Sequence, residues 1–170
     1  KLTGSLIPGQ LDTLARSGAV CDYILSEDLA NHPGDYKLYI FAGVLNYDEK
    51  FLQAVKKLRQ KNVTLLWLHA PGYSKNFTVD TAYMKELTGF DLAALPSAPA
   101  EICLNDGTMT GIAEDTLTPA FFVRDNSGAK VLGKYRDTAY TGMAEIREGA
   151  SRSIFCGSYR FSTAFMRELA

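Results

Sequence analysis

Apolar residues along the chain fall into strand-sized runs that are separated by stretches of helical spacing. The runs at residues 19–25, 36–43 and 63–68 are nearly continuous, which is typical of strands buried on both faces of a parallel sheet. Between the last two runs, residues 46–62 repeat apolar positions at helical spacing and place lysines on the opposite face. A strand, a helix and a strand within about 30 residues predict a βαβ unit.

The second half of the chain has a different pattern. Short β segments separated by turns occupy residues 96–150, and they predict an antiparallel β insertion. A buried strand at residues 152–158 and an amphipathic helix with Ser162 as its N-cap close the chain. The sequence therefore predicts a flavodoxin-like α/β fold. Residues 1–170 would form one three-layer αβα domain with a mostly parallel central sheet and this antiparallel insertion.

The beginning of the chain does not fit a complete domain of this kind. A doubly wound domain normally opens with a strand, whereas residues 1–9 contain two glycines and a proline and are predicted to form a loop. We therefore expect the chain to be a fragment of a larger protein, which would supply part of its surroundings.

Charge and residue content exclude several classes of function. Eighteen basic and nineteen acidic residues give a formal charge of −1, so we expect no nucleic-acid partner. The apolar runs are far shorter than the roughly 20 residues of a membrane-spanning helix, so we expect a soluble protein and no membrane partner. The three cysteines form no CxxC pair, and the two histidines form no HxH or HExxH pattern. We therefore predict no metal site, and without a GxGxxG or phosphate-loop pattern we predict no cofactor.

Candidate functional residues lie where the predicted parallel strands end. Ligands of open α/β sheets collect at the carboxyl ends of the strands, which here lead into residues 43–47, 69–76 and 157–160. Aromatic rings with polar tips suit both stacking on sugars and packing at interfaces. We predict ligand or interface contacts for four side chains of these loops: Tyr47, His69, Tyr73 and Tyr159.

Cys156 and His69 offer a second possibility at the same strand ends. Each closes a predicted core strand, so in a parallel sheet the two side chains could approach each other as a nucleophile and its base. A cysteine in an apolar strand is more often a small core residue. A histidine at the end of a strand is more often held by a hydrogen bond than used as a ligand. Both interpretations stay open at this point.

Three stretches of the sequence resemble a known family. They are DYKLYIFAGVLNYDEKFLQAVKKLRQKNVTLLWLHAPGY at residues 35–73, MKELTGF at 84–90 and RSIFCGSYRFSTAFMRELA at 152–170. They are similar to the class I glutamine-amidotransferase-like domain of some bacterial glycoside-hydrolase-like proteins, and in particular to the trimerisation domain of family 42 β-galactosidases. The resemblance covers most of the chain from about Leu11 onward.

The resemblance does not imply amidotransferase activity. In active members of the family, the elbow between a strand and a helix carries a nucleophilic cysteine. Here the matching elbow is residues 68–72, and the place of the nucleophile is held by Ala70, whose methyl group cannot attack a carbonyl. The family's histidine and glutamate find no match in GSYRFSTAF, so the resemblance implies that glutamine hydrolysis is absent.

What the resemblance implies instead is a non-catalytic accessory domain that mediates oligomerisation or packing beside a catalytic barrel. Such barrels need about 250 residues, so this chain is too short to be a whole glycosidase. The implied partners are the catalytic barrel of its own parent chain or further copies of the chain, with carbohydrate as another candidate. Two alternatives are a carbohydrate or small-molecule binding module and a cysteine hydrolase that uses Cys156 and His69. The compartment, cytoplasmic, periplasmic or secreted in a bacterium, is left open.

Overall fold

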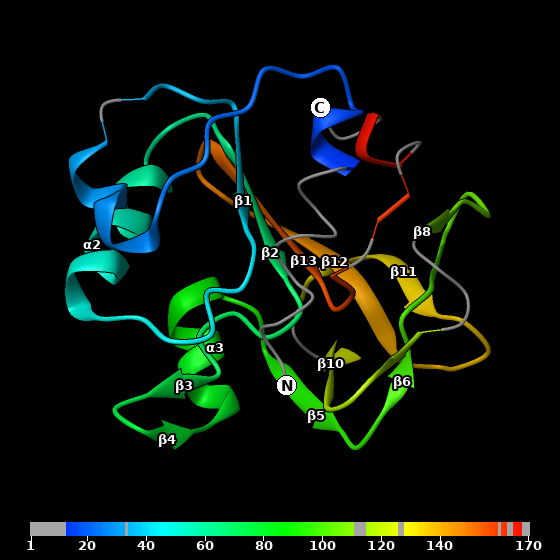
Figure 1. The fold of residues 1–170 in the computed structure, drawn as a ribbon. Helices are drawn as coiled ribbons and strands as arrows, with labels where there is room; N and C mark the ends of the chain where they lie inside the picture. Colours follow the sequence, from blue (N-terminus) through cyan, green and yellow to red (C-terminus); the bar gives the residue numbers. More distant parts are fainter. Residues whose placement is uncertain are drawn as a thin grey trace.

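The computed structural model describes residues 13–32, 34–110, 115–125, 128–159, 161–162 and 165–167. Figure 1 shows its helices and strands. The named helices are η1 (Ser26–Asn31, a 3-10 helix), α2 (Glu49–Leu58) and α3 (Thr81–Thr88). The strands are β1 (Leu38–Phe41), β2 (Thr64–Leu68), β3 (Ser74–Lys75), β4 (Thr78–Val79), β5 (Leu92–Leu95), β6 (Ala98–Pro99), β7 (Ile102–Leu104), β8 (Met109–Thr110), β9 (Thr116–Leu117), β10 (Ala120–Val123), β11 (Lys130–Tyr135), β12 (Thr141–Glu148) and β13 (Ser151–Cys156).

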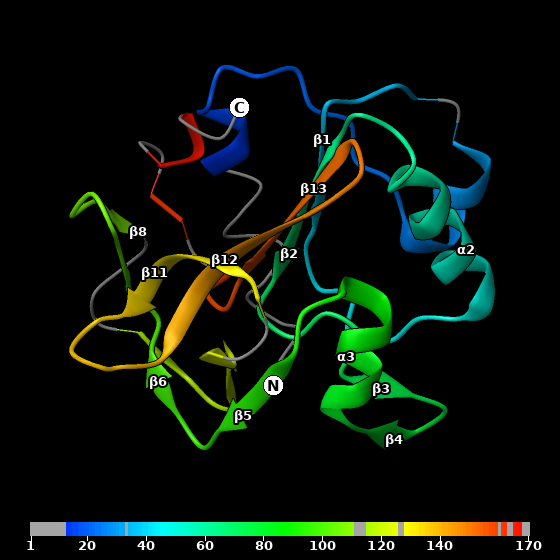
Figure 2. The ribbon, with the colours of Figure 1, turned by 180° about the vertical axis from the view of Figure 1, so that it is seen from behind.

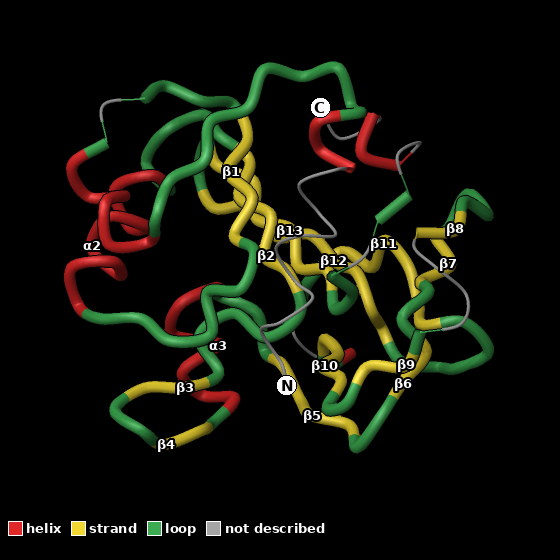
Figure 3. Tube along the Cα trace, viewed as in Figure 1, coloured by secondary structure: helices red, strands yellow, loops and turns green. Residues whose placement is uncertain are grey.

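Nine strands form one mixed, curled sheet (Figure 3). Its order is β1-β2-β13-β12-β11-β7-β8, and β10 joins β12 to β5. Among the described strands of this sheet, the pairs β1–β2 and β2–β13 are parallel and the other pairs are antiparallel. The parallel part is therefore a three-stranded portion of a larger, mostly antiparallel sheet.

The predicted flavodoxin-like, three-layer αβα fold is wrong. Residues 96–150 are not an insertion beside a finished parallel sheet, because β12 pairs with β13 along its length and continues the same sheet. The reason lies in the connections. Parallel neighbours need a crossover of a dozen or more residues, usually a helix, whereas β11, β12 and β13 follow one another through short turns. These strands can pair in sequence only as antiparallel neighbours.

The pairing of β11 with β12 is irregular at Gly133. The register of β11 on β12 shifts on both sides of this residue, and such irregularities increase the local twist. A Cβ atom at Gly133 would lie 2.7 Å from the carbonyl oxygen of Cys103 on β7. A side chain at this position would clash with the backbone of β7, so glycine permits the close approach of β11 to β7.

The predicted βαβ unit is confirmed as β1, α2 and β2. The apolar residues at helical spacing in α2 are buried, as expected from their pattern. The helix begins after Asp48, whose Oδ1 accepts a hydrogen bond of 2.8 Å from the Phe51 amide. Asn46, two residues before this cap, forms a β-bridge to Ser74.

The predicted strand at residues 19–25 is wrong. Residues 18–25 carry no regular secondary structure, and they run across one end of the parallel strands before entering η1 (Figure 1). The side chains of Val20, Tyr23 and Leu25 are 99%, 62% and 65% exposed. The segment is apolar, but no described strand pairs with it. An apolar run becomes a sheet strand only when a neighbouring strand shares its backbone hydrogen bonds.

The three parallel strands separate two clusters of buried side chains. On one face, Leu65, Trp67 and Phe155 pack with apolar residues of α2 and α3, which lie on the same side of the strands in both views (Figure 2). On the other face, Leu66, Leu68 and Cys156 pack with residues near the C-terminus, among them Phe161 and Phe165. No described helix is long and apolar enough to cross a membrane.

Candidate functional site

The carboxyl ends of β1, β2 and β13 lie side by side, because each strand is in parallel register with its neighbour. Backbone hydrogen bonds tie the loops that follow. The Gly72 amide donates to the Val44 carbonyl at 2.7 Å, and the His69 amide donates to the Cys156 carbonyl at 2.8 Å. The prediction that these three loops meet at one edge is therefore confirmed, although the sheet that carries them is not the predicted one.

His69 lies at the centre of an aromatic cluster at this edge. Its ring is edge-on to the rings of Tyr159 and Phe121, with centroids 5.3 and 5.8 Å away. Tyr73 also packs against Phe121, with ring centroids 4.8 Å apart. We call His69, Tyr73, Phe121 and Tyr159 the elbow cluster. Phe121, on β10, was not singled out from the sequence, because its position depends on pairings between distant strands.

The backbone and ring of His69 define its chemical state. Its φ of 63° is in the left-handed region, which is uncommon for a residue other than glycine. Nδ1 lies 3.1 Å from the Gly157 carbonyl oxygen; since a carbonyl only accepts, Nδ1 carries the proton. Burial lowers the pKa of the ring, and the hydrogen bond to Gly157 offsets part of that effect. His69 is thus a neutral, buried imidazole with 2% of its surface exposed.

This state makes the fold sensitive to mild acid. Because the pKa of His69 is lower in the folded chain than in the unfolded chain, where it is about 6.5, its contribution to stability is complete above that pH. The contribution decreases as the pH falls toward the folded pKa, by up to about 1.4 kcal/mol per pH unit. We expect urea unfolding to show this loss between pH 7 and 5.

The matched control is His69→Gln, which keeps a side-chain N–H group but cannot be protonated in this range. Its unfolding free energy should change less than that of the original chain between pH 7 and 5. Equal pH dependence of the two proteins would contradict the assignment of a buried neutral His69.

Cys156 lies beside Leu68 in the register of β13 and β2, with none of its surface exposed. Burial raises the pKa of its thiol to about 12, and a hydrogen bond from the Ser158 backbone offsets this only in part. A catalytic cysteine needs the opposite shift, toward a thiolate at neutral pH. The proposal of a Cys156–His69 pair therefore starts from a protonated thiol and from a histidine whose Nδ1 is engaged with Gly157.

Tyr47 is close to the same edge but is not part of the elbow cluster. Its ring is 5% exposed, and its hydroxyl donates to the Glu86 carboxylate and lies 3.1 Å from the Tyr83 carbonyl oxygen. Burial, followed by the hydrogen bond to Glu86, raises the pKa of this phenol. Lys75 pairs with Glu86 at 2.7 Å and lies 5.0 Å above the Tyr47 ring. Tyr47 thus joins the loop after β1 to α3 and to the β3–β4 hairpin.

The β3–β4 hairpin projects from the molecule beside α3 (Figure 1). Its turn residues Asn76 and Phe77 have φ of 51° and 65°, the combination of a tight two-residue hairpin turn that normally favours Asn-Gly. The Phe77 side chain is 106% exposed, and Val79 on the adjoining strand is 61% exposed. A bulky apolar residue therefore occupies a strained turn position with its side chain exposed to solvent.

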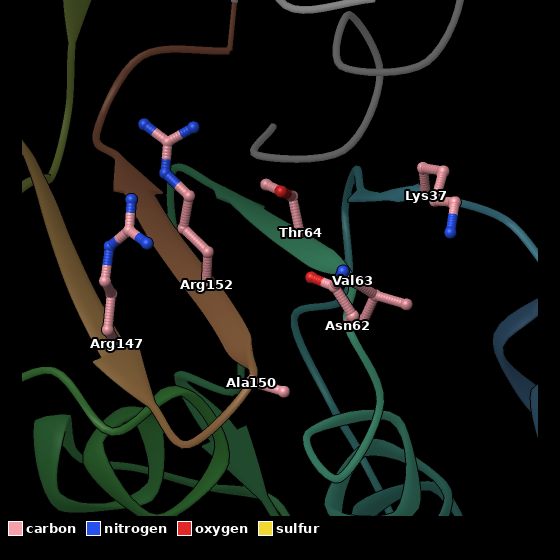
Figure 4. Close-up of a pocket in the computed structure, with 7 residues that line it drawn as sticks. All are labelled: Lys37, Asn62, Val63, Thr64, Arg147, Ala150 and Arg152. Carbon is pink, nitrogen blue, oxygen red and sulfur yellow. The ribbon is translucent and has the colours of Figure 1, made fainter.

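A polar cavity of about 260 Å³ lies at the opposite edge, where the parallel strands begin (Figure 4). Its walls come from the starts of β1, β2 and β13 and from the end of β12. The lining residues are Lys37, Asn62, Val63, Thr64, Arg147, Ala150 and Arg152. Sequence reasoning missed this cavity because it considered only the carboxyl ends of the strands. The alternation of Glu145 and Arg147, followed by Arg152 after a turn, was the available signal.

No three described His, Cys, Asp or Glu side chains converge as ligands for a metal ion. The side chains gathered at the elbow are mainly aromatic.

A scan against protein-family models finds no match, and a search of the curated proteins finds no significant match. Solved structures do match. The β-galactosidase from Bacillus circulans sp. alkalophilus has a TM-score of 0.72 and 20% identity, over 98% of this chain and 26% of the enzyme. Gan42B, a GH42 β-galactosidase from G. stearothermophilus, has a TM-score of 0.68 and 17% identity, over 95% and 25%.

The same fold also matches the mmIFT52 N-terminal domain, with a TM-score of 0.51 and 14% identity, over 88% of this chain and 78% of that one. At such identities the comparisons establish the fold alone. This chain spans about a quarter of the length of the β-galactosidases that it resembles. It is folded like a segment of GH42 β-galactosidases.

Proposed function

We propose that this chain is a non-catalytic accessory domain of a glycoside-hydrolase-like protein, and that it mediates oligomerisation or interdomain packing beside a catalytic barrel. The similarity to β-galactosidases supports this proposal, because it covers nearly all of this chain and only about a quarter of those enzymes. The amidotransferase-like elbow predicted at residues 68–72 would then be a degenerate one, with Ala70 buried and His69 folded into the aromatic cluster.

The observation that carries the proposal is the exposed Phe77. Phe77 is unfavourable in the isolated chain for two reasons. Its phenyl ring is exposed to water, and its backbone has a positive φ that is strained for a residue other than glycine. Val79 extends the apolar surface of the same hairpin. Large apolar side chains that enter a partner's pocket dominate the energy of protein interfaces. We propose that Phe77 is such an anchor and that its pocket belongs to the parent's barrel or to another copy of the chain.

The test measures the native mass of the chain by light scattering over a range of concentrations, alone and with the parent protein's barrel added. We expect a stable oligomer or a complex with the barrel. Phe77→Ser should weaken that association by roughly tenfold or more without lowering the melting temperature, because Phe77 is fully exposed. Val20→Ser is the matched control, since it removes an equally exposed apolar residue from a different surface.

If the chain stays monomeric and does not bind the barrel, the assembly role is contradicted, and the alternative of a carbohydrate-binding module is favoured. The half-buried rings of Tyr73 and Tyr159, on two sides of the elbow cluster, are the residues that this alternative would use. It would be tested by titrating galactose and longer β-galactosides against the chain and against a Tyr73→Ala variant.

A further inference from the structure

The cavity at the start of the parallel strands is lined by one row of polar side chains. In the sheet register, Arg147 on β12 is opposite Arg152 on β13, and Arg152 is opposite Thr64 on β2. Side chains of directly opposed residues leave a sheet on the same face. Figure 4 shows the two arginine side chains parallel to each other on neighbouring strands, with Thr64 beside them.

Two arginines directly opposite each other repel, which is unfavourable in a sheet. The buried carboxylate of Glu145 contacts both arginines and reduces this repulsion. Its Oε1 accepts from Arg147 Nε at 2.8 Å, and its Oε2 accepts from Arg152 Nε at 2.8 Å. Burial raises the pKa of Glu145, but the hydrogen bonds from Arg147 and Arg152 outweigh it and leave the pKa below its usual value. The carboxylate is therefore ionised and neutralises one of the two positive charges.

The carboxylate also holds both guanidinium groups in place. The Glu145 side chain is 6% exposed, whereas those of Arg147 and Arg152 are 73% and 39% exposed, so the charged ends reach the cavity from a buried anchor. Arg147 uses only Nε in this contact, and Arg152 uses Nε and Nη2. Both Nη groups of Arg147 and the Nη1 group of Arg152 have no partner among the described residues.

Lys37 adds a further positive charge on the far side of the cavity (Figure 4). Its ammonium group forms no ion pair with any described residue, and the hydroxyl of Thr64 is a neutral donor between Lys37 and the arginines. With Glu145 counted, the three cationic side chains leave a net charge of about +2 around a small cavity. Pre-positioned guanidinium groups match the planar or tetrahedral oxygens of carboxylates and phosphates.

We propose that this cavity binds the oxyanion of a small molecule, either a phosphate or a carboxylate group, with Arg147 and Arg152 as the principal donors and Lys37 and Thr64 at its rim. The site lies at the opposite edge of the parallel strands from the elbow cluster and is formed within one chain. The proposed anion site does not depend on the assembly role, and a monomeric chain would contain it as well.

Calorimetric titration with two probes tests the proposal and separates the two sources of the oxyanion. Inorganic phosphate and sodium acetate are each titrated into the chain at low ionic strength, with sodium chloride as the reference for general salt effects. We expect saturable binding of at least one probe, with a dissociation constant in the millimolar range. Tighter binding of phosphate would identify a phosphate group as the ligand, and tighter binding of acetate would identify a carboxylate.

Arg147→Gln removes an exposed guanidinium and leaves the contact between Arg152 and Glu145 intact. It should weaken binding roughly tenfold, as expected for the loss of charge-assisted hydrogen bonds. Lys37→Gln, which breaks no described side-chain contact, should weaken binding by a smaller factor. Lys50→Gln removes the same charge at the opposite end of the parallel strands, in the first turn of α2, and should bind like the original chain.

Three results would overturn the proposal. The first is no binding of either probe beyond that of chloride. The second is equal binding by the original chain and Arg147→Gln. The third is an equal loss in Lys37→Gln and Lys50→Gln, which would indicate a general charge effect. If Arg147→Gln unfolds, the comparison of the two lysine variants still decides the outcome, because neither side chain contributes to the core.

Discussion

Replacing Trp67 with alanine is expected to lower the free energy of unfolding by about 4 kcal/mol. Trp67 is fully buried on the middle strand of the parallel portion. Its ring stacks on Phe41 of β1 at 4.1 Å, and in the register it is the neighbour of Phe155 on β13. Alanine would leave a large cavity between three strands and α2. Urea unfolding followed by circular dichroism measures the loss.

Trp67→Phe is the matched control for this prediction. Phenylalanine keeps an aromatic ring against Phe41, and it removes Trp67 Nε1, a buried donor with no hydrogen-bond partner among the described residues. Removing an unsatisfied buried donor is favourable, and this gain offsets part of the free-energy cost of the smaller side chain. We therefore expect Trp67→Phe to cost less than about half of the alanine substitution. Similar costs for the two variants would show that Trp67 is not held between the strands as described.

Cys156 is expected to react with a thiol reagent about a thousandfold more slowly than Cys21 or Cys103 at pH 7.5. Cys21 and Cys103 are exposed, whereas Cys156 is buried. A thiol with a pKa of about 12 is ionised some three orders of magnitude less at this pH than one with the ordinary pKa of about 8.5. Mass spectrometry of peptides from a time course of labelling measures the three rates separately.

Unfolded chain in urea is the reference, since all three cysteines should then react at similar rates. Rapid labelling of Cys156 in the folded chain would contradict its burial and revive the alternative of a hydrolase that uses Cys156 and His69. Slow labelling would leave that alternative without the thiolate that it requires, because His69 is neutral and its Nδ1 is engaged with Gly157.

Local patterns predicted the βαβ unit of the fold correctly, whereas pairing between distant segments decided the rest of the sheet. β1, α2 and β2 could be identified because each is specified within a short window of sequence. β5 and β12 join through β10, whose partners lie about 20 to 30 residues away on either side. Local sequence patterns cannot predict pairings between strands that lie so far apart in the chain. Residues 19–25 show the converse, since their apolar pattern is strand-like but no described strand pairs with them.

The candidate sites also differ in how far local sequence patterns could predict them. The βαβ pattern implies that the loops after β1 and β2 lie at the same edge, and the parallel pairing of β13 with β2 adds the third loop. The position of Phe121 does not follow from it, and neither does the row formed by Arg147 and Arg152. Recognising that row from the sequence requires the register of β12 on β13 and the burial of Glu145, and an exposed arginine is otherwise an ordinary surface residue.

The place of β13 in the sheet also bears on how the chain can be synthesised. β13 is formed by residues 151–156, yet it lies between β2 and β12 and covers one side of the central strand. Domains fold as units, and contacts between distant residues form slowly. A nascent chain therefore cannot complete its central sheet until residue 156 has left the ribosome. Until then β2, one of its most apolar segments, has an unpaired edge that a chaperone or a neighbouring nascent chain can occupy.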